Sequence, residues 1–192
     1  MNSNNLISRN FTAIAILLAI AVFLGCTPKK NTNVFTDPGN HPVESGLLLL
    51  AVSTGYTDFK TERTINATPA RIFSIITDYE KYPLYFPDLH DKIEIISQTK
   101  TGQGVVWKNT GTYKGKSFTS TWKVTEYLVN EKVVMQDTEG EGKVTLSIAA
   151  ATSGQTRYIY DGHLFMFLPV KNEFFVILEK EADSVKIYSE KQ

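Results

Sequence analysis

Residues 59–87 constrain the fold most, because the sequence changes its periodicity twice within this short stretch. Residues 59–65 alternate with a period of two and include β-branched side chains, which predicts a strand. Thr68 and Pro69 then suit the N-cap and the first position of a helix. Helical spacing of apolar residues follows, and a second short helix is expected over residues 79–85. A strand that leads into two short helices is an uncommon opening for an all-β protein, so a mixed domain is expected.

The remainder of the chain predicts a sheet and one long helix. Between residues 90 and 167, alternating segments are separated by turn residues at intervals that suit about six antiparallel strands. Beyond Pro169, apolar residues follow three-and-four spacing, which predicts an amphipathic helix over residues 172–191 with Asn172 as its N-cap. The charged residues of that helix, Glu181 among them, are assigned to its solvent face. Because a sheet needs its apolar face covered, we expect an α+β domain in which the long helix crosses a curved sheet.

The composition indicates one ordinary globular domain. The chain has 192 residues, of which 42% are hydrophobic and 21% are charged, so it can bury a sizeable core. The formal net charge is zero, and residues 26–192 carry nineteen bases against twenty acids. This balance argues against a nucleic-acid-binding surface, which normally has an excess of bases.

The N-terminus has the layout of a secretory signal. Residues 1–10 are polar with one positive charge, and residues 11–25 are almost wholly apolar. An apolar run of about fifteen residues is shorter than the roughly twenty that a membrane span needs. Cys26 follows directly after Phe-Leu-Gly, a sequence that resembles the site where bacterial lipoproteins are cut and lipidated. We therefore expect residues 1–25 to be a lipoprotein signal peptide and Cys26 to be the lipidation site; an ordinary signal peptide or an uncleaved anchor is the alternative.

The segment after Cys26 is expected to tether the domain. Cys26 is the only cysteine, so it cannot form an internal disulfide, and acyl chains on it would hold the protein on a membrane. Residues 26–45 are rich in Pro, Asn, Thr and charge, which predicts a flexible tether. By resemblance to the sorting rules for lipoproteins in cells with two membranes, Thr27 in place of aspartate would favour the outer membrane in such a cell. Residues 47–52 form a short apolar run that fits either a strand or a helical turn. The domain is expected over residues 46–192, on an exported, membrane-anchored lipoprotein of the cell envelope.

The start of the domain resembles a known superfamily. Residues 65–73 (INATPARIF) and residues 78–89 (DYEKYPLYFPDL) are similar to the opening of START-related SRPBCC proteins. The closest resemblance is to the polyketide cyclase/dehydrase and coenzyme Q-binding branch. With the C-terminal helix, it covers residues 56–192. It implies a helix-grip fold, in which a curved antiparallel sheet wraps around a long C-terminal helix. It leaves the chemistry open, since such proteins include lipid and quinone binders, hormone receptors and cyclases.

On this resemblance, a ligand cavity is expected between the sheet and the long helix, with a filled core as the alternative. Aromatic side chains would supply apolar surface, and Tyr and Trp would add a polar tip that orients a ligand. Tyr82, Tyr85 and Phe86 are expected to border the cavity mouth. The residues expected to line the cavity are Phe59, Arg63, Tyr82, Tyr85, Phe86, Trp107, Asn109, Phe118, Ser120, Trp122, Tyr160, Phe174 and Leu178.

Arg63 is the most specific polar position in this set. Its alternation with Phe59 places it on the face that points towards the sheet interior. A buried arginine needs a partner, which we expect to be Glu181, Asp137 or the anionic group of a ligand.

Signals for catalysis are weak. His163 and Asp161 on the last strand are weak candidates for an acid/base pair. Asp88, His90 and Asp91 fall in an expected surface loop, where polar residues are ordinary. The three histidines lack metal-ligand spacing, so no metal is expected, and the sequence contains no phosphate-binding loop or nucleophile elbow that would indicate a cofactor or a hydrolase.

The sequence favours a membrane-tethered module that binds a lipid, an isoprenoid or another apolar small molecule, without a nucleic-acid or metal partner. The alternative is a cyclase-, dehydrase- or hydrolase-type enzyme that acts on a hydrophobic substrate in the same cavity. A third interpretation is an envelope structural or interaction protein with a filled core.

Overall fold

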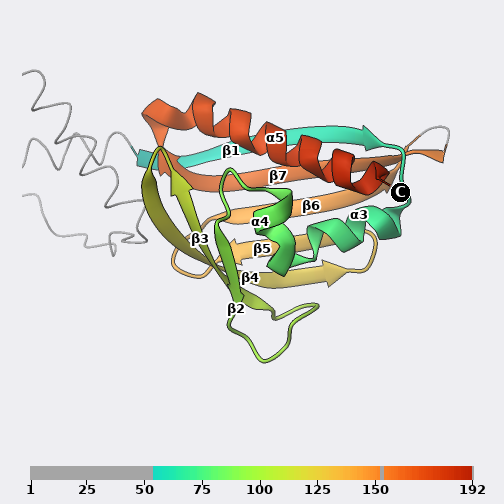
Figure 1. Ribbon diagram of the computed structural model, residues 1–192, viewed down its shortest axis with the longest axis horizontal. Coiled ribbons are helices and arrows are strands. Elements are labelled where there is room, and N and C mark those ends of the chain that lie inside the picture. The colour runs from blue at the N-terminus through green and yellow to red at the C-terminus, as the bar shows by residue number, and fades with distance from the viewer. Residues whose placement is uncertain (1–53, 152–153, 192) are drawn as a thin grey trace, which may run out of the picture.

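The computed structural model describes residues 54–151 and 154–191, which form a curved sheet with a long helix across its concave face (Figure 1). The sheet is antiparallel, has seven strands and follows the order β1-β7-β6-β5-β4-β3-β2. The strands are β1 (Thr54–Ile65), β2 (Lys92–Ile95), β3 (Val106–Tyr113), β4 (Lys116–Leu128), β5 (Lys132–Asp137), β6 (Lys143–Ala150) and β7 (Thr156–Phe167). The helices are α3 (Pro69–Ile76), α4 (Tyr82–Tyr85) and α5 (Lys171–Glu190), with short 3₁₀ turns η1 (Tyr79–Lys81) and η3 (Leu168–Val170). The expected α+β helix-grip architecture is confirmed.

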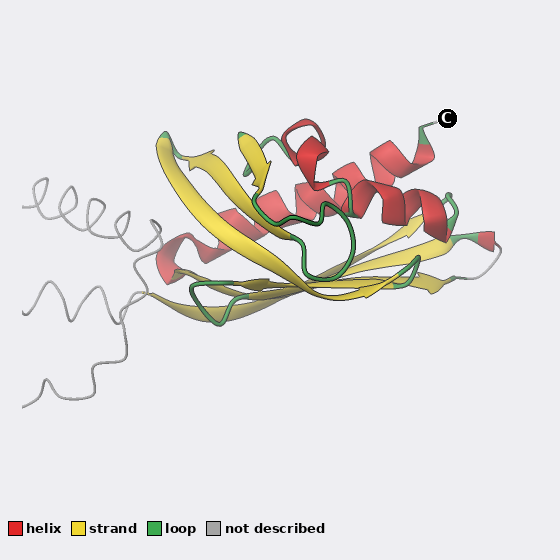
Figure 2. Ribbon diagram, turned by 90° about the horizontal axis from the view of Figure 1, so that it is seen from below, coloured by secondary structure: helices red, strands yellow, loops and turns green. Residues whose placement is uncertain are grey.

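The helices all lie on one side of the sheet, as Figure 2 shows. Alternation along the strands sends every second side chain towards them. On β7, Tyr158, Tyr160, Gly162 and Leu164 are buried, whereas the residues that alternate with them are exposed or half-buried. The register sets Tyr160 beside Leu146 of β6, so neighbouring strands present apolar side chains to the same face. The core therefore lies between the concave face and the helices.

The first helix begins as its sequence predicts. Thr68 is the N-cap of α3, and its hydroxyl accepts a hydrogen bond from the Arg71 amide at 3.2 Å. Four apolar residues of α3 are buried, and the helix packs against both α5 and β6.

The long helix begins one residue earlier than its expected cap. Val170 is the N-cap of α5, so Asn172 lies within the first turn, and the prediction of Asn172 as the cap is wrong. The 3₁₀ turn that contains Pro169 leads directly into the helix, which leaves no separate capping residue between the two.

The expectations for residues 1–53 lie outside the described residues. They comprise the signal peptide over 1–25, lipidation of Cys26, the tether over 26–45 and the apolar run over 47–52. None of the helices in the described part of the chain is long and apolar enough to cross a bilayer.

Candidate functional site

A cavity of about 210 Å³ lies between the concave face of the sheet, α4 and α5. Strands β3 to β7 contribute most of its lining, and α5 covers it with residues such as Phe174, Leu178 and Val185. Most of these side chains are apolar. A cavity of about 150 Å³ is large enough for benzene, so this one has room for roughly one or two fused rings, or a short chain of similar volume.

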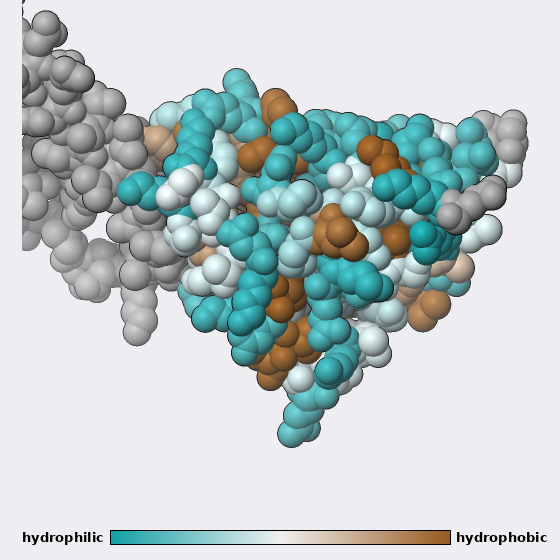
Figure 3. Space-filling view, in the orientation of Figure 1, coloured by the Kyte–Doolittle hydropathy of each residue, from teal (hydrophilic) through white to brown (hydrophobic). Residues whose placement is uncertain are grey.

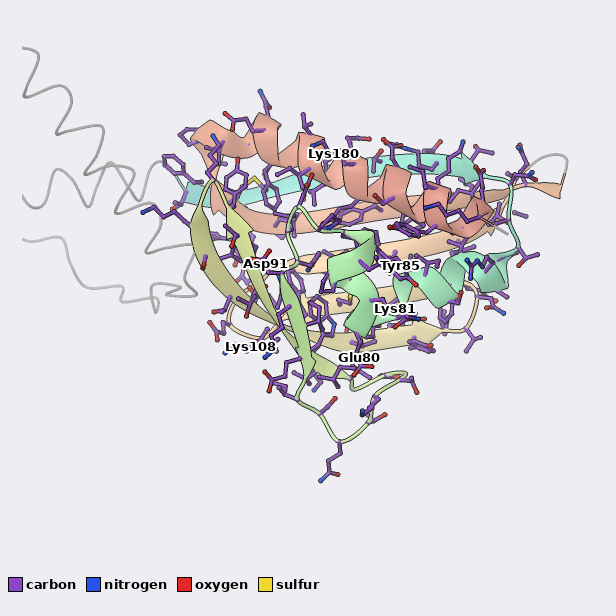
Figure 4. The ribbon with its side chains drawn as sticks, in the orientation of Figure 1. Glu80, Lys81, Tyr85, Asp91, Lys108 and Lys180 are labelled. Carbon is purple, nitrogen blue, oxygen red and sulfur yellow. The ribbon has the colours of Figure 1, made fainter. Side chains whose placement is uncertain are left out.

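Most of the residues predicted to line the cavity lie around it. They are Tyr82, Phe86, Trp107, Asn109, Phe118, Ser120, Trp122, Tyr160, Phe174 and Leu178. Phe59 and Tyr85 are buried elsewhere in the core. Phe59 packs between Tyr160 and Phe175, and Tyr85 packs on Tyr188, with ring centroids 4.8 Å apart in the last contact. Figure 4 shows Tyr85 on α4.

Arg63 also lies outside the cavity, where it joins β1 to α5. Its Nε donates to Asp183 Oδ1 at 2.6 Å and its Nη2 donates to Glu179 Oε2 at 2.5 Å. The hydrogen bond to Asp183 is the largest cause that raises the pKa of the guanidinium. Arg63 does point to the helix side of the sheet, as its alternation predicts. The expected partners Glu181 and Asp137 are wrong, because β1 is an edge strand and meets the flank of α5 rather than its buried stripe.

The open end of the cavity lies where the β3–β4 hairpin approaches the start of α5. The half-buried lining residues Tyr113, Phe118 and Phe174 gather there, and the rings of Tyr113 and Phe174 meet edge to face at 6.2 Å. Next to them, Lys114 forms an ion pair with Glu173. The start of β1 lies at the same end of the molecule (Figures 1 and 2). Tyr82 and Phe86, expected at the mouth, are instead buried deep in the cavity wall.

The inner end of the cavity carries three polar side chains, His90, Asn109 and Glu181. His90 Nδ1 lies 3.0 Å from Asn109 Oδ1, and its Nε2 lies 3.5 Å from Glu181 Oε1. The side chains of His90 and Glu181 are each only 12% exposed. This constellation is the main feature that the sequence analysis missed.

Glu181 is on the buried stripe of α5, so its assignment to the solvent face is wrong. It follows Leu178 by three residues and precedes Val185 by four, spacings that place all three on one side of a helix. Both of those neighbours are buried. The residue type suggested solvent, but the spacing alone indicated burial, and a buried acid on an apolar stripe is itself a signal of a functional site.

Three tyrosines surround this inner end, and all three resist ionisation. Burial raises the pKa of Tyr82, Tyr158 and Tyr160 well above the usual range of a phenol. The nearby carboxylate of Glu181 raises the pKa of each phenol further. The phenols of all three therefore remain protonated near Glu181 across the physiological range.

The polar side chains of the loop that carries His90, namely Asp88, His90 and Asp91, point in three different directions. Asp88 accepts a hydrogen bond at 3.2 Å from Lys180, which Figure 4 labels on α5. Asp91 accepts one at 2.6 Å from Thr112 on β3. Of these three side chains only that of His90 lines the cavity, so the prediction of an ordinary surface loop is correct for the two acids and wrong for the histidine.

The weak catalytic candidates His163 and Asp161 lie on the outer face of the sheet. His163 Nδ1 is 2.7 Å from Asp58 Oδ1, and its ring stacks on Tyr56. Asp161 faces Lys60 at 3.9 Å. Neither residue borders the inner end of the cavity. Within residues 54–151 and 154–191, no group of three or more His, Cys, Asp and Glu side chains could hold a metal ion.

The fold and cavity define a helix-grip protein of the START-like type. The sequence profile of the family described as "Polyketide cyclase / dehydrase and lipid transport" matches residues 56–182. The chain belongs to this family, which confirms the superfamily that its sequence resembles. Comparison with curated proteins gives no significant match.

Solved structures share the fold at low sequence identity. A START superfamily protein from Mycobacterium smegmatis is 18% identical, with a TM-score of 0.59, and covers 71% of this chain and 98% of its own. A truncated norcoclaurine synthase from Thalictrum flavum is 16% identical, with a TM-score of 0.57, and covers 73% and 98%. A protein from Thermus thermophilus is 14% identical, with a TM-score of 0.59, and covers 69% and 97%. Identities this low support the fold alone.

Proposed function

We propose that this protein is a membrane-tethered module that binds an apolar small molecule in the cavity between the sheet and α5. The observation that carries the proposal is an apolar-lined space of about 210 Å³ within a family described by cyclase, dehydrase and lipid-transport functions. Proteins pack their interiors densely, so a space of this size is a feature that a purely structural core would not retain.

The outer surface offers a weaker alternative. In Figure 3, hydrophobic side chains form small groups that are interrupted by hydrophilic ones. Large exposed apolar residues are spread over α4, α5, η3 and the ends of β2 and β4, and include Leu84, Ile96, Leu128, Val129, Leu168, Val176 and Ile187. Scattered residues of this kind are normal on soluble domains. This distribution supports the cavity as the functional site.

The proposed tether would bring the cavity mouth towards a membrane. β1 begins at the open end of the cavity, so a tether upstream of Thr54 would join the domain at that end. An apolar molecule could then pass between bilayer and cavity over a short distance. Lipidation of Cys26 is tested by a Cys26→Ser variant, which should lose acyl incorporation and leave the membrane fraction after signal cleavage. A cleaved Cys26→Ser chain that stays on the membrane would contradict the anchor.

Ligand binding is tested by native mass spectrometry of the protein purified from its own host. We expect a copurified apolar molecule in the wild type and its loss in Val144→Trp, since Val144 lines the cavity and a larger ring would occupy it. The matched control is Thr145→Trp on the same strand, because Thr145 is half-buried and does not line the cavity. Equal occupancy in the wild type and Val144→Trp would refute the cavity as the binding site.

An enzymatic function has one observation in its favour. Asn109 fixes the orientation of the His90 ring within the cavity, and an oriented imidazole is the usual form of a general base. If the protein is a cyclase or dehydrase, His90→Gln should abolish turnover and retain binding, whereas His163→Gln should leave both unchanged. Loss of turnover in His163→Gln alone would contradict this assignment.

A further inference from the structure

Two buried polar atoms of the cavity lining lack a hydrogen-bond partner in the part of the chain that the structure describes. Glu181 Oε1 and Trp107 Nε1 are both buried, and neither has a hydrogen-bond partner among residues 54–151 and 154–191. Both residues line the cavity, and both approach the His90 ring. Because buried polar atoms are normally hydrogen-bonded, one unsatisfied acceptor and one unsatisfied donor in the same cavity indicate a polar group on its ligand.

The hydrogen bonds of Asn109 determine which ring nitrogen of His90 carries a hydrogen. Asn109 Nδ2 donates to the Leu89 carbonyl oxygen at 3.2 Å, so its Oδ1 faces His90 Nδ1 and accepts that proton. His90 Nε2 then faces Glu181 Oε1, where two lone pairs would repel each other. A ligand group that donates a hydrogen bond to either atom would relieve this repulsion.

The distance between His90 Nε2 and Glu181 Oε1 suggests that a ligand group lying beside both atoms could bridge them. Nε2 and Oε1 are 3.5 Å apart, beyond the 2.7–3.2 Å of an ordinary hydrogen bond. A hydroxyl group both donates and accepts, so it can donate to Glu181 Oε1 and still accept a hydrogen bond from a neighbouring donor. The N–H of Trp107 can donate a hydrogen bond to the same hydroxyl oxygen, or to another acceptor atom of the ligand.

We propose that the inner end of the cavity recognises the hydroxyl group of a neutral alcohol or phenol whose apolar body fills the remaining space. This inference rests on the proposed binding function and specifies the class of ligand. A carboxylate ligand is disfavoured because it would meet the acceptor oxygens of Glu181. An ammonium ligand is disfavoured because it has no acceptor for the N–H of Trp107.

The test compares three probes of one shape: naphthalene, 2-naphthol and 2-naphthoate. Binding is measured by isothermal titration calorimetry of the full chain in lipid nanodiscs, with empty nanodiscs subtracted to remove partitioning. We expect 2-naphthol to bind about tenfold or more tightly than naphthalene, and 2-naphthoate to bind most weakly. Glu181→Leu should remove the preference for 2-naphthol and retain naphthalene binding. Glu190→Gln, a change at the exposed end of the same helix, should keep the wild-type order.

The outcomes separate this inference from the proposed function. Equal affinities for 2-naphthol and naphthalene, tighter binding of 2-naphthoate, or an unchanged preference in Glu181→Leu would overturn the hydroxyl site, while cavity binding would stand. Failure of all three probes to bind would count against the proposed function itself. The ranking in the wild type needs no variant, so the inference remains falsifiable even if Glu181→Leu does not fold.

Discussion

At the scale of single residues, a glycine on β3 allows the polar groups at the inner end of the cavity to take their positions. A Cβ on Gly111 would lie 2.2 Å from the Leu89 carbonyl oxygen, far inside van der Waals contact. That same oxygen accepts the hydrogen bond from Asn109 Nδ2, and Asn109 orients His90. Gly111 therefore allows the His90 loop to pack directly against β3.

Gly111→Ala should disturb both stability and binding. Backbone atoms must move to make room for the new methyl group, and we expect a loss of about 1–3 kcal/mol in the free energy of unfolding, measured by denaturant titration. The preference for 2-naphthol over naphthalene should also decrease in this variant, because His90 loses its position. Gly55→Ala is the control, since its Cβ would meet only Leu168 Cδ1 at 3.8 Å and should change stability by less than about 0.5 kcal/mol. Equal effects of the two changes would contradict this account.

The sequence predicted the cavity residues on strands better than the polar residues on the loop and the helix. Trp107, Asn109 and Phe118 could be placed around a cavity because strand alternation sets their face. His90 could not, since its direction depends on a loop that is shaped by Gly111 on a strand about twenty residues further along the chain. Glu181 was assigned to the solvent face because it is charged, although its three-residue spacing from Leu178 indicated the buried face of the helix.

At the scale of elements, a charged cluster joins the edge strand β1 to α5. Arg63 bridges Glu179 and Asp183, and the Thr61 hydroxyl donates to Glu179 Oε2 at 2.8 Å. The Arg63 side chain is 21% exposed, whereas those of Glu179 and Asp183 are 42% and 56% exposed, so water screens these ion pairs only in part. The cluster fixes the helix over the cavity.

Arg63→Ala should therefore destabilise the domain by about 1–3 kcal/mol, since charge-assisted hydrogen bonds in partly buried positions are lost. Lys60→Ala, on the same strand but on the outer face, removes only an exposed pair and should change stability by less than about 1 kcal/mol. Thermal unfolding of both variants in the same buffer provides the measurement. A larger effect from Lys60→Ala would show that the cluster does not hold the helix.

The elements themselves were largely predictable. The seven strands, the cap at Thr68 and the C-terminal helix follow from local periodicity, which the final structure preserves. The partners of Arg63 were not predictable, because they depend on how α5 is rotated about its axis. That rotation is set by packing of Leu178, Ala182 and Val185 against the sheet.

At the scale of the whole molecule, burial of phenols links stability to alkaline pH. Burial is the largest cause that raises the pKa of Tyr79, Tyr82, Tyr158 and Tyr160. Each phenol keeps its proton in the folded protein and loses it near pH 10 when unfolded. Their contribution to stability is therefore complete below about pH 10 and declines as the pH rises above that value.

Absorbance at 295 nm should show these four tyrosines ionising only when the protein unfolds. The free energy of unfolding should fall by about 1.4 kcal/mol per pH unit for each such group above pH 10. Tyr160→Phe should make the fall in the free energy of unfolding above pH 10 shallower by about 1.4 kcal/mol per pH unit. Ionisation of all nine tyrosines before unfolding would contradict their burial.

The central claim is that apolar molecules enter the cavity between the sheet and α5. Methyl NMR of the full chain in nanodiscs, titrated with naphthalene, tests it most directly. We predict saturable shifts of the Val144, Leu146 and Leu178 methyl groups, which line the cavity, with little change at the exposed methyl groups of Val176 and Ile187. Shifts confined to Val176 and Ile187, or no saturable shift at any cavity methyl group, would contradict it.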